Sequence, residues 1–305
     1  MSGIQQARTF VARDGAVNVV RPYGQGHLEA RLLYRDLDNE RRRACVYLSS
    51  HSGCRMGCQF CWLTQQGQTS MRHASVEQYA GQAREMLVLH DSRSDPRVVE
   101  HREQMRLHYN FMARGDPLAN GPVVFQWPAI SQVLHEMGEL SRFASTRCNV
   151  STIMPTALGG RDLRHVFAQR PPWMYYSLYS LDRAFRDKWM PNAMPVARAM
   201  DRLAALQEHN GQPLTLHWAA IKDANDSLDD ARAIARLVDS YALRDVRFSL
   251  VRYNPHPRSG SAEADPKRLD EIRAILATAV RSSKIIERVG KEAYASCGMF
   301  PEDDD

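Results

Sequence analysis

Apolar positions along the chain follow two periods, one typical of buried strands and one of helices. Six short apolar runs with strand-favouring composition predict strands at Cys45–Ser50, Leu107–Met112, Cys148–Thr152, Trp173–Leu178, Leu214–Ile221 and Val246–Val251. The segments between these runs have helical patterns. We therefore expect six βα repeats, which form a parallel sheet with helical crossovers, either as an open doubly wound sheet or as a partial barrel.

Three of the helices are marked by their ends. One over about Ser75–Leu89 begins with Ser75-Val76-Glu77-Gln78, a capping-box pattern. A second ends at Asn210-Gly211, and a third begins at Ser227. Apolar residues recur at helical spacing in the last two: Val196, Met200, Leu203 and Leu206, then Ala231, Ile234 and Val238.

The sequence shows no Gly/Ser-rich or Pro-rich linker and no internal repeat, so no boundary divides it into separate domains. We expect a short β-rich extension over residues 1–44, a core over residues 45–300 and an acidic tail over residues 301–305. Strands in the extension are predicted at Thr9–Ala12, Asn18–Arg21 and Leu28–Tyr34. The highly charged stretch Ser92–Arg106 is expected to lie on the surface.

Composition narrows the class of protein. The chain has 305 residues, of which 44% are apolar, enough for one large domain or two small ones. The formal net charge of +5 tolerates a polyanionic partner without requiring one. A run of about eighteen apolar residues, which a membrane span needs, is missing. Met1–Val11 lacks the apolar core of a signal peptide, so we expect a cytoplasmic protein whose six cysteines form no disulfide framework.

The strongest chemical signal is Cys54-Arg-Met-Gly-Cys58-Gln-Phe-Cys61, directly after the first predicted core strand. Three thiolates at this spacing can bind three corners of a [4Fe–4S] cluster and leave the fourth iron open to a chelating molecule. A zinc site would need a fourth ligand, and the nearby His51 and His73 complete no familiar zinc pattern. The spacing favours a cluster over zinc or structural cysteines, and Phe60 fits as a shield against solvent.

This cysteine motif resembles that of the radical S-adenosylmethionine (SAM) superfamily. In that superfamily the open iron binds the amino and carboxylate groups of SAM, and one electron from the cluster cleaves SAM to methionine and a 5′-deoxyadenosyl radical. The resemblance implies an α/β fold, a partial (β/α)6 barrel with a short β-rich N-terminal extension. It also implies SAM as a cofactor and a [4Fe–4S] cluster held by Cys54, Cys58 and Cys61.

Further segments, in the same order along the chain, resemble motifs of the radical SAM RNA adenine methyltransferases, the RlmN/Cfr family. They are Asn110–Asn120, Val150–Thr152, Ser177–Tyr179 followed by Arg186-Asp187 and Pro191-Asn192, Asp223–Ser227, Tyr253–Pro255 and Tyr294–Gly298. The resemblance covers about residues 26–300. It implies methylation of an adenine ring carbon, C2 rather than C8, in ribosomal or transfer RNA.

The same resemblance assigns contacts with SAM. Gly115 and Asp116 would hold its amino group, with Asp in place of the family's Glu. Its ribose, adenine and methionine would be contacted by Ser151, Ser177, Leu178, Tyr179 and Asn254. Tyr179 departs from the His that is usual in the family. Taken singly, Ser177 would more often be a satisfied strand hydroxyl and Asn254 a turn residue.

Cys297 is implied to carry the methyl group. One SAM would methylate its sulfur, and the radical from a second SAM would take hydrogen from that methyl group, so that two SAM are used per turnover. The carbon radical would add to adenine, and a second cysteine would release the product by forming a disulfide. We assign this role to Cys45 because it shares a strand face with Tyr47, the ungapped counterpart. The alternatives are a buried small residue for Cys297 and a core strand residue for Cys45.

Glu29 matches a glutamate in the family's lead-in hairpin, which implies a base that removes the ring proton. The alternative is a solvated surface glutamate. About forty residues precede the first core strand, so the chain is expected to lack most of the family's helical accessory domain. Arg41-Arg42-Arg43 and Arg55 are expected to contact RNA phosphates, the alternative being a solvated strand edge.

The partners follow from the same resemblance. We expect an RNA substrate, an electron donor such as flavodoxin or ferredoxin, no membrane and a monomer. One alternative is a radical SAM enzyme with the same machinery that acts on a substrate other than RNA. Another is a non-catalytic Fe–S protein that binds RNA, which the presence of both Cys297 and Cys45 disfavours.

Overall fold

The structure is a computed structural model and describes residues 6–241 and 243–302. The chain forms two compact units, each assembled from separate segments. The first comprises Met1–Arg55, Gln68–Val150 and Val289–Ala295, and the second comprises Met56–Gly67, Ser151–Arg288 and Ser296–Asp305. The sequential division into residues 1–44, 45–300 and 301–305 stays a prediction, and residues 1–5 and 303–305 lie outside the described residues.

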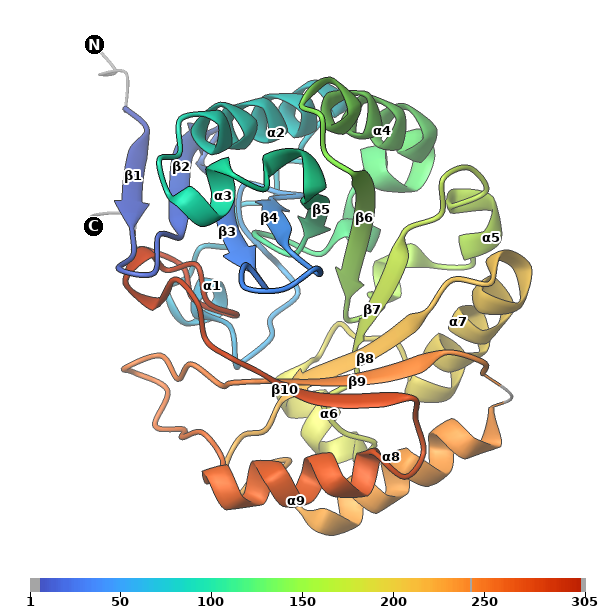
Figure 1. Ribbon diagram of the computed structural model, residues 1–305. Helices are drawn as coiled ribbons and strands as arrows, with labels where there is room; N and C mark the ends of the chain where they lie inside the picture. Colours follow the sequence, from blue (N-terminus) through green and yellow to red (C-terminus); the bar gives the residue numbers. More distant parts are fainter. Residues whose placement is uncertain (1–5, 242, 303–305) are drawn as a thin grey trace. The chain divides into compact units, whose positions relative to one another are not determined.

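The first unit is built on strands β1 (Arg8–Val11), β2 (Val17–Tyr23), β3 (Gly26–Arg35), β4 (Arg43–Leu48), β5 (Arg106–Phe111) and most of β6 (Ser145–Thr152). Strands β1 to β4 pair antiparallel, and β4, β5 and β6 pair parallel. The lead-in strands predicted from the sequence are therefore present, and they join the parallel strands in one sheet (Figure 1).

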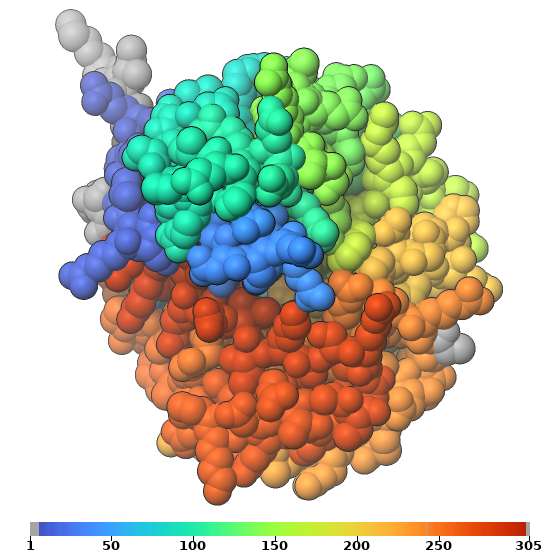
Figure 2. All heavy atoms as spheres, in the orientation of Figure 1, coloured from blue at the N-terminus to red at the C-terminus, as the bar shows by residue number. Residues whose placement is uncertain are grey.

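Two long helices, α2 (Val76–Asp91) and α4 (Gly121–Leu140), cover one face of these strands (Figure 1). Tyr79 of α2 and Trp127 of α4 both pack on Phe111 of β5, with ring centroids 5.1 and 5.4 Å apart. The shorter helices are α3 (Pro96–Val99), η1 (Arg102–Gln104), η2 (Pro117–Ala119) and η4 (Lys291–Ala293). Segment Ser92–Arg106 is largely exposed, as expected, and Figure 2 shows its atoms in teal at the surface.

The second unit is built on strands β7 (Trp173–Ser177), β8 (Leu214–Ala219), β9 (Val246–Val251) and β10 (Ser282–Ile286). All pair parallel. Its helices are α1 (Trp62–Gln65), η3 (Thr156–Leu158), α5 (Leu163–Val166), α6 (Arg183–Trp189), α7 (Val196–Asn210), α8 (Leu228–Ser240) and α9 (Pro266–Leu276).

The predicted helix ends are confirmed. Ser75 and Gln78 form the capping box of α2. Gly211 ends α7 with a φ of 66°, a left-handed conformation that a residue without Cβ adopts at little cost. Ser227 caps α8 by accepting the backbone N–H of Asp230 at 3.0 Å. Each of the six predicted core runs coincides with one of β4 to β9, whereas β10 is not predicted.

Alternation along the parallel strands places polar side chains on one face and apolar ones on the other. In β5, Leu107, Tyr109 and Phe111 are fully buried on the helix-covered face. His108 and Asn110 lie on the opposite face and are also buried. No helix within the described part of the chain combines the length and the apolar character that a bilayer crossing requires.

Candidate active site

The three cysteines of the predicted cluster motif are divided between the two units. Cys54 belongs to the first unit, where its backbone N–H donates to the carbonyl of Gln68 at 3.0 Å. Cys58 and Cys61 belong to the second unit, and the N–H of Cys61 donates to the carbonyl of Cys58 at 3.0 Å. Cys61 is also the N-cap of α1, so the motif leads directly into that helix.

As placed, no three His, Cys, Asp or Glu side chains among the described residues could hold a single metal ion. A [4Fe–4S] cluster requires a different arrangement of ligands, because each thiolate binds a separate iron atom. The donor set of three cysteine thiols within eight residues fits such a cluster chemically.

Tyr179 lies near three thiols of the second unit. Its ring stacks on Phe60, with centroids 3.9 Å apart and an angle of 9° between the planes. Burial raises the pKa of Tyr179 well above its usual value, and the nearby thiols of Cys297, Cys58 and Cys61 raise it further when ionised. Two of the predicted cluster ligands and the predicted methyl carrier therefore surround one buried aromatic side chain.

The backbone around Tyr179 is held by specific hydrogen bonds. Its φ is +59°, and its carbonyl accepts Nδ2 of Asn225 at 2.9 Å. The carbonyl of Leu178 accepts the guanidinium of Arg186 at 2.7 Å. Asn225 belongs to the Asp223–Ser227 motif, so one structural task of that motif is to fix the turn that carries Tyr179.

Ser151 and Ser177 are brought together by His217 on β8. Both hydroxyl oxygens lie within hydrogen-bonding distance of its Nε2, at 2.9 and 3.0 Å. Burial lowers the pKa of His217 to about 4, so the ring is neutral at physiological pH. The sequence does not single out His217, and the two predicted SAM-contacting serines share it as a partner.

Cys297 is exposed, so the alternative of a buried small residue is wrong. Asn254 donates Nδ2 to the carbonyl of Cys297 at 2.9 Å, and the backbone N–H of Trp62 donates to the carbonyl of Gly298 at 3.0 Å. The loop that carries the thiol is therefore hydrogen-bonded on both sides. Nδ2 of Asn254 also donates to the carbonyl of Arg252, two residues earlier, at 3.4 Å.

Gly115 and Asp116 of the first unit follow β5. Gly115 has a φ of +85°, and a Cβ atom there would lie 2.4 Å from Nδ1 of His51 and 2.7 Å from Oγ of Ser50. Only glycine fits this position, which brings the backbone close to the turn after β4. Asp116 is buried and accepts the backbone N–H of Leu118 at 2.9 Å, as the cap of η2.

Glu29 lies in the interior of the first unit, fully shielded from solvent, so the surface alternative is wrong. Arg114 and Arg31 contact its two carboxylate oxygens, each at 2.7 Å. Burial by itself would raise the pKa of Glu29, but the two guanidinium groups outweigh it and the pKa is lowered. The sequence does not single out Arg114 as a partner of Glu29, and no described contact tests the predicted role of Glu29 as a base.

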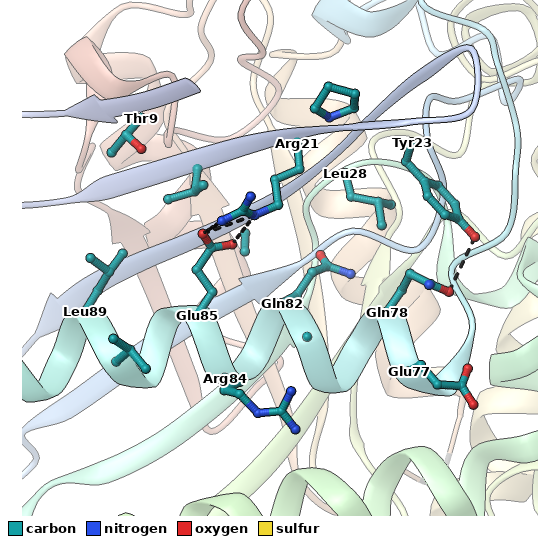
Figure 3. A pocket seen from close by; sticks show the side chains of 15 residues that line it. Thr9, Arg21, Tyr23, Leu28, Glu77, Gln78, Gln82, Arg84, Glu85 and Leu89 are labelled. Carbon is teal, nitrogen blue, oxygen red and sulfur yellow. Dashed lines mark hydrogen bonds and ion pairs between the residues drawn. The ribbon is translucent and has the colours of Figure 1, made fainter. Parts of the chain in front are cut away.

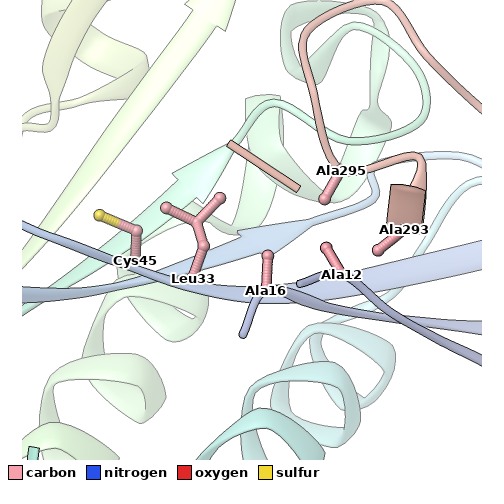
Figure 4. Packing of buried hydrophobic residues seen from close by; sticks show 6 residues of the cluster. All are labelled: Ala12, Ala16, Leu33, Cys45, Ala293 and Ala295. Carbon is pink, nitrogen blue, oxygen red and sulfur yellow. The ribbon is translucent and has the colours of Figure 1, made fainter. Parts of the chain in front are cut away.

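Cys45 belongs to an apolar cluster of the first unit (Figure 4). The buried members of this cluster are Ala12, Ala16, Leu33, Cys45, Ala293 and Ala295. Burial raises the pKa of its thiol, although Arg43, Arg35 and Arg147 act in the opposite direction. Tyr47 packs against the same cluster. Cys45 and Cys297 belong to different units, so the resolving role of Cys45 stays a prediction.

The arginine run has local tasks. Arg42 donates Nε to the carbonyl of Leu37 at 3.0 Å, and Arg43 forms an ion pair with Asp36. These contacts brace the turn between β3 and β4. Arg41 and Arg55 are exposed, and Arg55 donates Nε to the carbonyl of Thr69 at 3.1 Å. RNA contact by these arginines stays a prediction.

A groove of about 660 Å³ lies between β2, β3 and α2 of the first unit (Figure 3). Its apolar floor includes Val19, Leu28 and Ala30, and the ion pair of Arg21 with Glu85 crosses it. The lining includes none of the predicted site residues, so the groove is separate from the candidate site.

No family model matches the chain. The chain is 26% identical over 264 residues to "Dual-specificity RNA methyltransferase RlmN" of Anaeromyxobacter sp. (strain Fw109-5), covering 86% of this chain and 65% of that protein. It is 28% identical over 280 residues to "Probable RNA methyltransferase" of Rhodopseudomonas palustris (strain BisB5), covering 90% and 68%. The chain thus spans about two thirds of the length of these relatives.

Among solved structures, a radical SAM methyltransferase from Sphaerobacter thermophilus superposes with a TM-score of 0.78 and 19% sequence identity, over 96% of this chain and 80% of that one. The fold is therefore the partial barrel of radical SAM enzymes, as the cysteine motif indicated. The curated relatives are more specific than the fold, because the chain is a homologue of proteins named RlmN.

Proposed function

We propose that this chain is a radical SAM methyltransferase that methylates an adenine ring carbon of RNA, at C2 rather than C8, in ribosomal or transfer RNA. The observation that carries the proposal is the hydrogen bond of 3.0 Å from the N–H of Trp62, next to Cys61, to the carbonyl of Gly298, next to Cys297, beside Tyr179, on which all three thiols act. An exposed thiol next to cluster cysteines suits a methyl carrier, because it is accessible to a methyl donor and to a substrate. The names of the curated relatives support RNA as the substrate.

The cofactors of this proposal are a [4Fe–4S] cluster on Cys54, Cys58 and Cys61 and two molecules of SAM per turnover. When bound, they supply a 5′-deoxyadenosyl radical, and the protein supplies orientation and the exclusion of water. The residues present fit these groups chemically, since three cysteine thiols lie within eight residues of sequence. An electron donor such as flavodoxin or ferredoxin would reduce the cluster.

The residues predicted to contact SAM then have tasks in binding and orienting it. Gly115 and Asp116 orient the amino group of SAM. Ser151 and Ser177, fixed by His217, and Asn254, fixed on the Cys297 loop, orient its remaining polar groups. The stacked rings of Phe60 and Tyr179 help to exclude water from the buried thiol of Cys58.

Cys297 accepts the methyl group on its sulfur, which requires loss of the thiol proton. Cys45 is proposed to resolve the adduct: its deprotonated sulfur would bond to the Cys297 sulfur while the bond from that sulfur to the methyl-derived carbon on adenine breaks, and the carbon would leave with the electron pair and take up a proton. Ala295, two residues before Cys297 in the sequence, packs in the same apolar cluster as Cys45.

The experiment uses protein expressed with iron and handled without oxygen. Mass spectrometry of the peptide Glu292–Asp305 is expected to find Cys297 one methylene heavier, and C297A is the control. Incubation with labelled SAM and RNA from cells without this modification should then yield 2-methyladenosine. An unmodified Cys297 in protein that binds a cluster and cleaves SAM would overturn the methyl-cysteine mechanism. A methylated Cys297 without transfer to any RNA would favour the alternative of a different substrate.

A further inference from the structure

Trp62 stands at the junction between the cluster motif and the loop that carries Cys297. It directly follows Cys61 and begins α1. Its backbone N–H donates to the carbonyl of Gly298 at 3.0 Å, and its indole Nε1–H donates to the carbonyl of Asn254 at 2.9 Å. Trp62 therefore donates both to the loop that carries Cys297 and to Asn254, which itself donates to the carbonyl of Cys297.

The indole is also held from its side. Its ring packs edge-on against His256, with ring centroids 5.0 Å apart and an angle of 86°. Gln66, at the end of α1, donates Nε2 to the carbonyl of Phe300 at 3.1 Å. Helix α1 thus contacts the loop around Cys297 at both of its ends.

Asn254 extends this connection to Cys297 itself, because its amide has a fixed orientation. Arg288 donates Nε to Oδ1 of Asn254 at 2.9 Å, and only an oxygen can accept there. The amide nitrogen must therefore point the other way, where it donates to the carbonyl of Cys297 at 2.9 Å. Arg288 is held in turn by Glu263 at 2.9 Å, which also binds Arg252.

We propose that Trp62 is a positioning residue that couples the cluster motif to the loop of Cys297, so that cluster binding restricts access to the Cys297 thiol. This inference rests on the proposed function for the assignment of Cys58 and Cys61 as cluster ligands. A single peptide unit joins Cys61 to Trp62, so fixing the Cys61 sulfur on an iron also restricts Trp62. Through its two hydrogen bonds Trp62 then holds Gly298, the next residue after Cys297, and Asn254, whose amide donates to the carbonyl of Cys297.

The coupling is measured as the rate at which iodoacetamide alkylates Cys297, read by mass spectrometry of its peptide. Protein purified without the cluster is compared with the same protein after reconstitution with iron and sulfide in the absence of SAM, so that Cys297 stays an unmethylated thiol. Reconstitution is expected to slow alkylation of Cys297 in the native protein. This readout requires neither RNA nor methyl transfer, so its failure is distinguishable from failure of the proposed function.

The decisive variant is W62F, which keeps an aromatic ring and the backbone N–H but loses the indole donor. Loss of that hydrogen bond is expected to raise the alkylation rate of the reconstituted protein about fivefold. The visible absorbance per protein should match that of the native protein, which shows that the cluster still forms. W189F is the control, because Trp189 is also half-buried in the second unit and stacks on Phe185 instead.

A second variant tests the hydrogen bond from Arg288 that orients the side-chain amide of Asn254. R288K keeps a cation near Glu263 but removes the Nε donor that orients the amide, so alkylation of Cys297 should also accelerate. Amide hydrogen exchange of the peptide that contains Gly298 separates loop opening from a change in thiol reactivity. Equal alkylation rates in native protein, W62F and R288K, all with a full cluster, would overturn the proposal, and so would the same acceleration in W189F.

Discussion

Arg114 and Glu29 form an ion pair of 2.7 Å in the interior of the first unit, with both side chains fully shielded from solvent. Arg114 immediately precedes the Gly115-Asp116 pair, and its carbonyl accepts the N–H of Ser50 at 2.8 Å. Glu29 lies on β3, and its backbone exchanges hydrogen bonds with the hydroxyl of Ser49. The ion pair therefore ties the segment after β5 to the turn after β4 that leads to Cys54.

Replacing Arg114 with Met should destabilise the first unit. Arg31 would still contact Glu29, but the buried carboxylate would lose one of the two guanidinium groups that compensate its charge, which costs about 3 kcal/mol in the free energy of unfolding. The comparison is R21M, which breaks the more exposed pair of Arg21 with Glu85 and should cost about 1 kcal/mol or less. Urea unfolding measures both variants. Equal losses in R114M and R21M would show that the buried pair contributes no more than a surface one.

The same carboxylate predicts a pH dependence. The pKa of Glu29 is lowered from its ordinary value of 4.5, so the folded state favours the ionised form more than the unfolded state does. Its contribution is therefore fully present above pH 4.5 and is lost as the pH falls through the lower pKa of the folded state. The difference in free energy of unfolding between native protein and E29Q should be constant above pH 4.5 and shrink below it. A difference that grows on acidification would contradict the lowered pKa.

Most of the fold could be predicted from the sequence, because β4 to β9 are apolar runs bounded by helical patterns. Strand β10 was missed because Ser282–Ile286 is only partly buried and begins with Ser-Ser-Lys, which carries no strand pattern. In the site, the cysteine spacing and the ordered motifs single out Cys58, Cys61 and Cys297, because each lies in a short local pattern, and their roles stay predictions.

The partners that hold the site residues in place could not be found in this way. His217 is one of two polar residues in the otherwise apolar strand β8, and it meets Ser151 and Ser177 only because three strands come together. Arg114 binds Glu29 across 85 residues of sequence, and the indole of Trp62 reaches Asn254 across 192. Local spacing in the sequence does not reveal such contacts, because they depend on strand register and on how distant segments of the chain pack together.

Gly115 should not tolerate a side chain. In G115A the new methyl group would meet His51 and Ser50 at a backbone position that already has a positive φ, so both folding and SAM binding should be impaired. Gly67 is a matched control, because its φ is +70° but nothing lies within 4 Å of its Cβ position. G67A should cost only the conformational strain, about 1 kcal/mol. Thermal unfolding and calorimetric titration with SAM compare the two variants, and SAM binding by G115A at native affinity would remove Gly115 from the proposed site.

Cys58 should be needed for the cluster, whereas Cys148 should not. C58A is expected to lose the brown chromophore and all SAM cleavage after reconstitution, because a [4Fe–4S] cluster needs its thiolate ligands. C148A alters an equally buried cysteine in β6 outside the motif, and it should keep the chromophore. Iron and sulfide analysis with the visible spectrum provides the measurement. An undiminished chromophore in C58A would exclude that residue as a ligand.

Cys45 should be needed to release the methylated product. If it attacks the sulfur of Cys297, C45A cannot form the disulfide, and the protein should accumulate as a covalent adduct with RNA. Denaturing gel electrophoresis of labelled RNA after incubation with SAM and a reductant detects the adduct. Y47F is the control, because Tyr47 packs against the same apolar cluster but carries no thiol. Multiple turnovers by C45A without trapped RNA would assign the resolving step to a different residue, and trapping in Y47F as well would attribute the effect to packing.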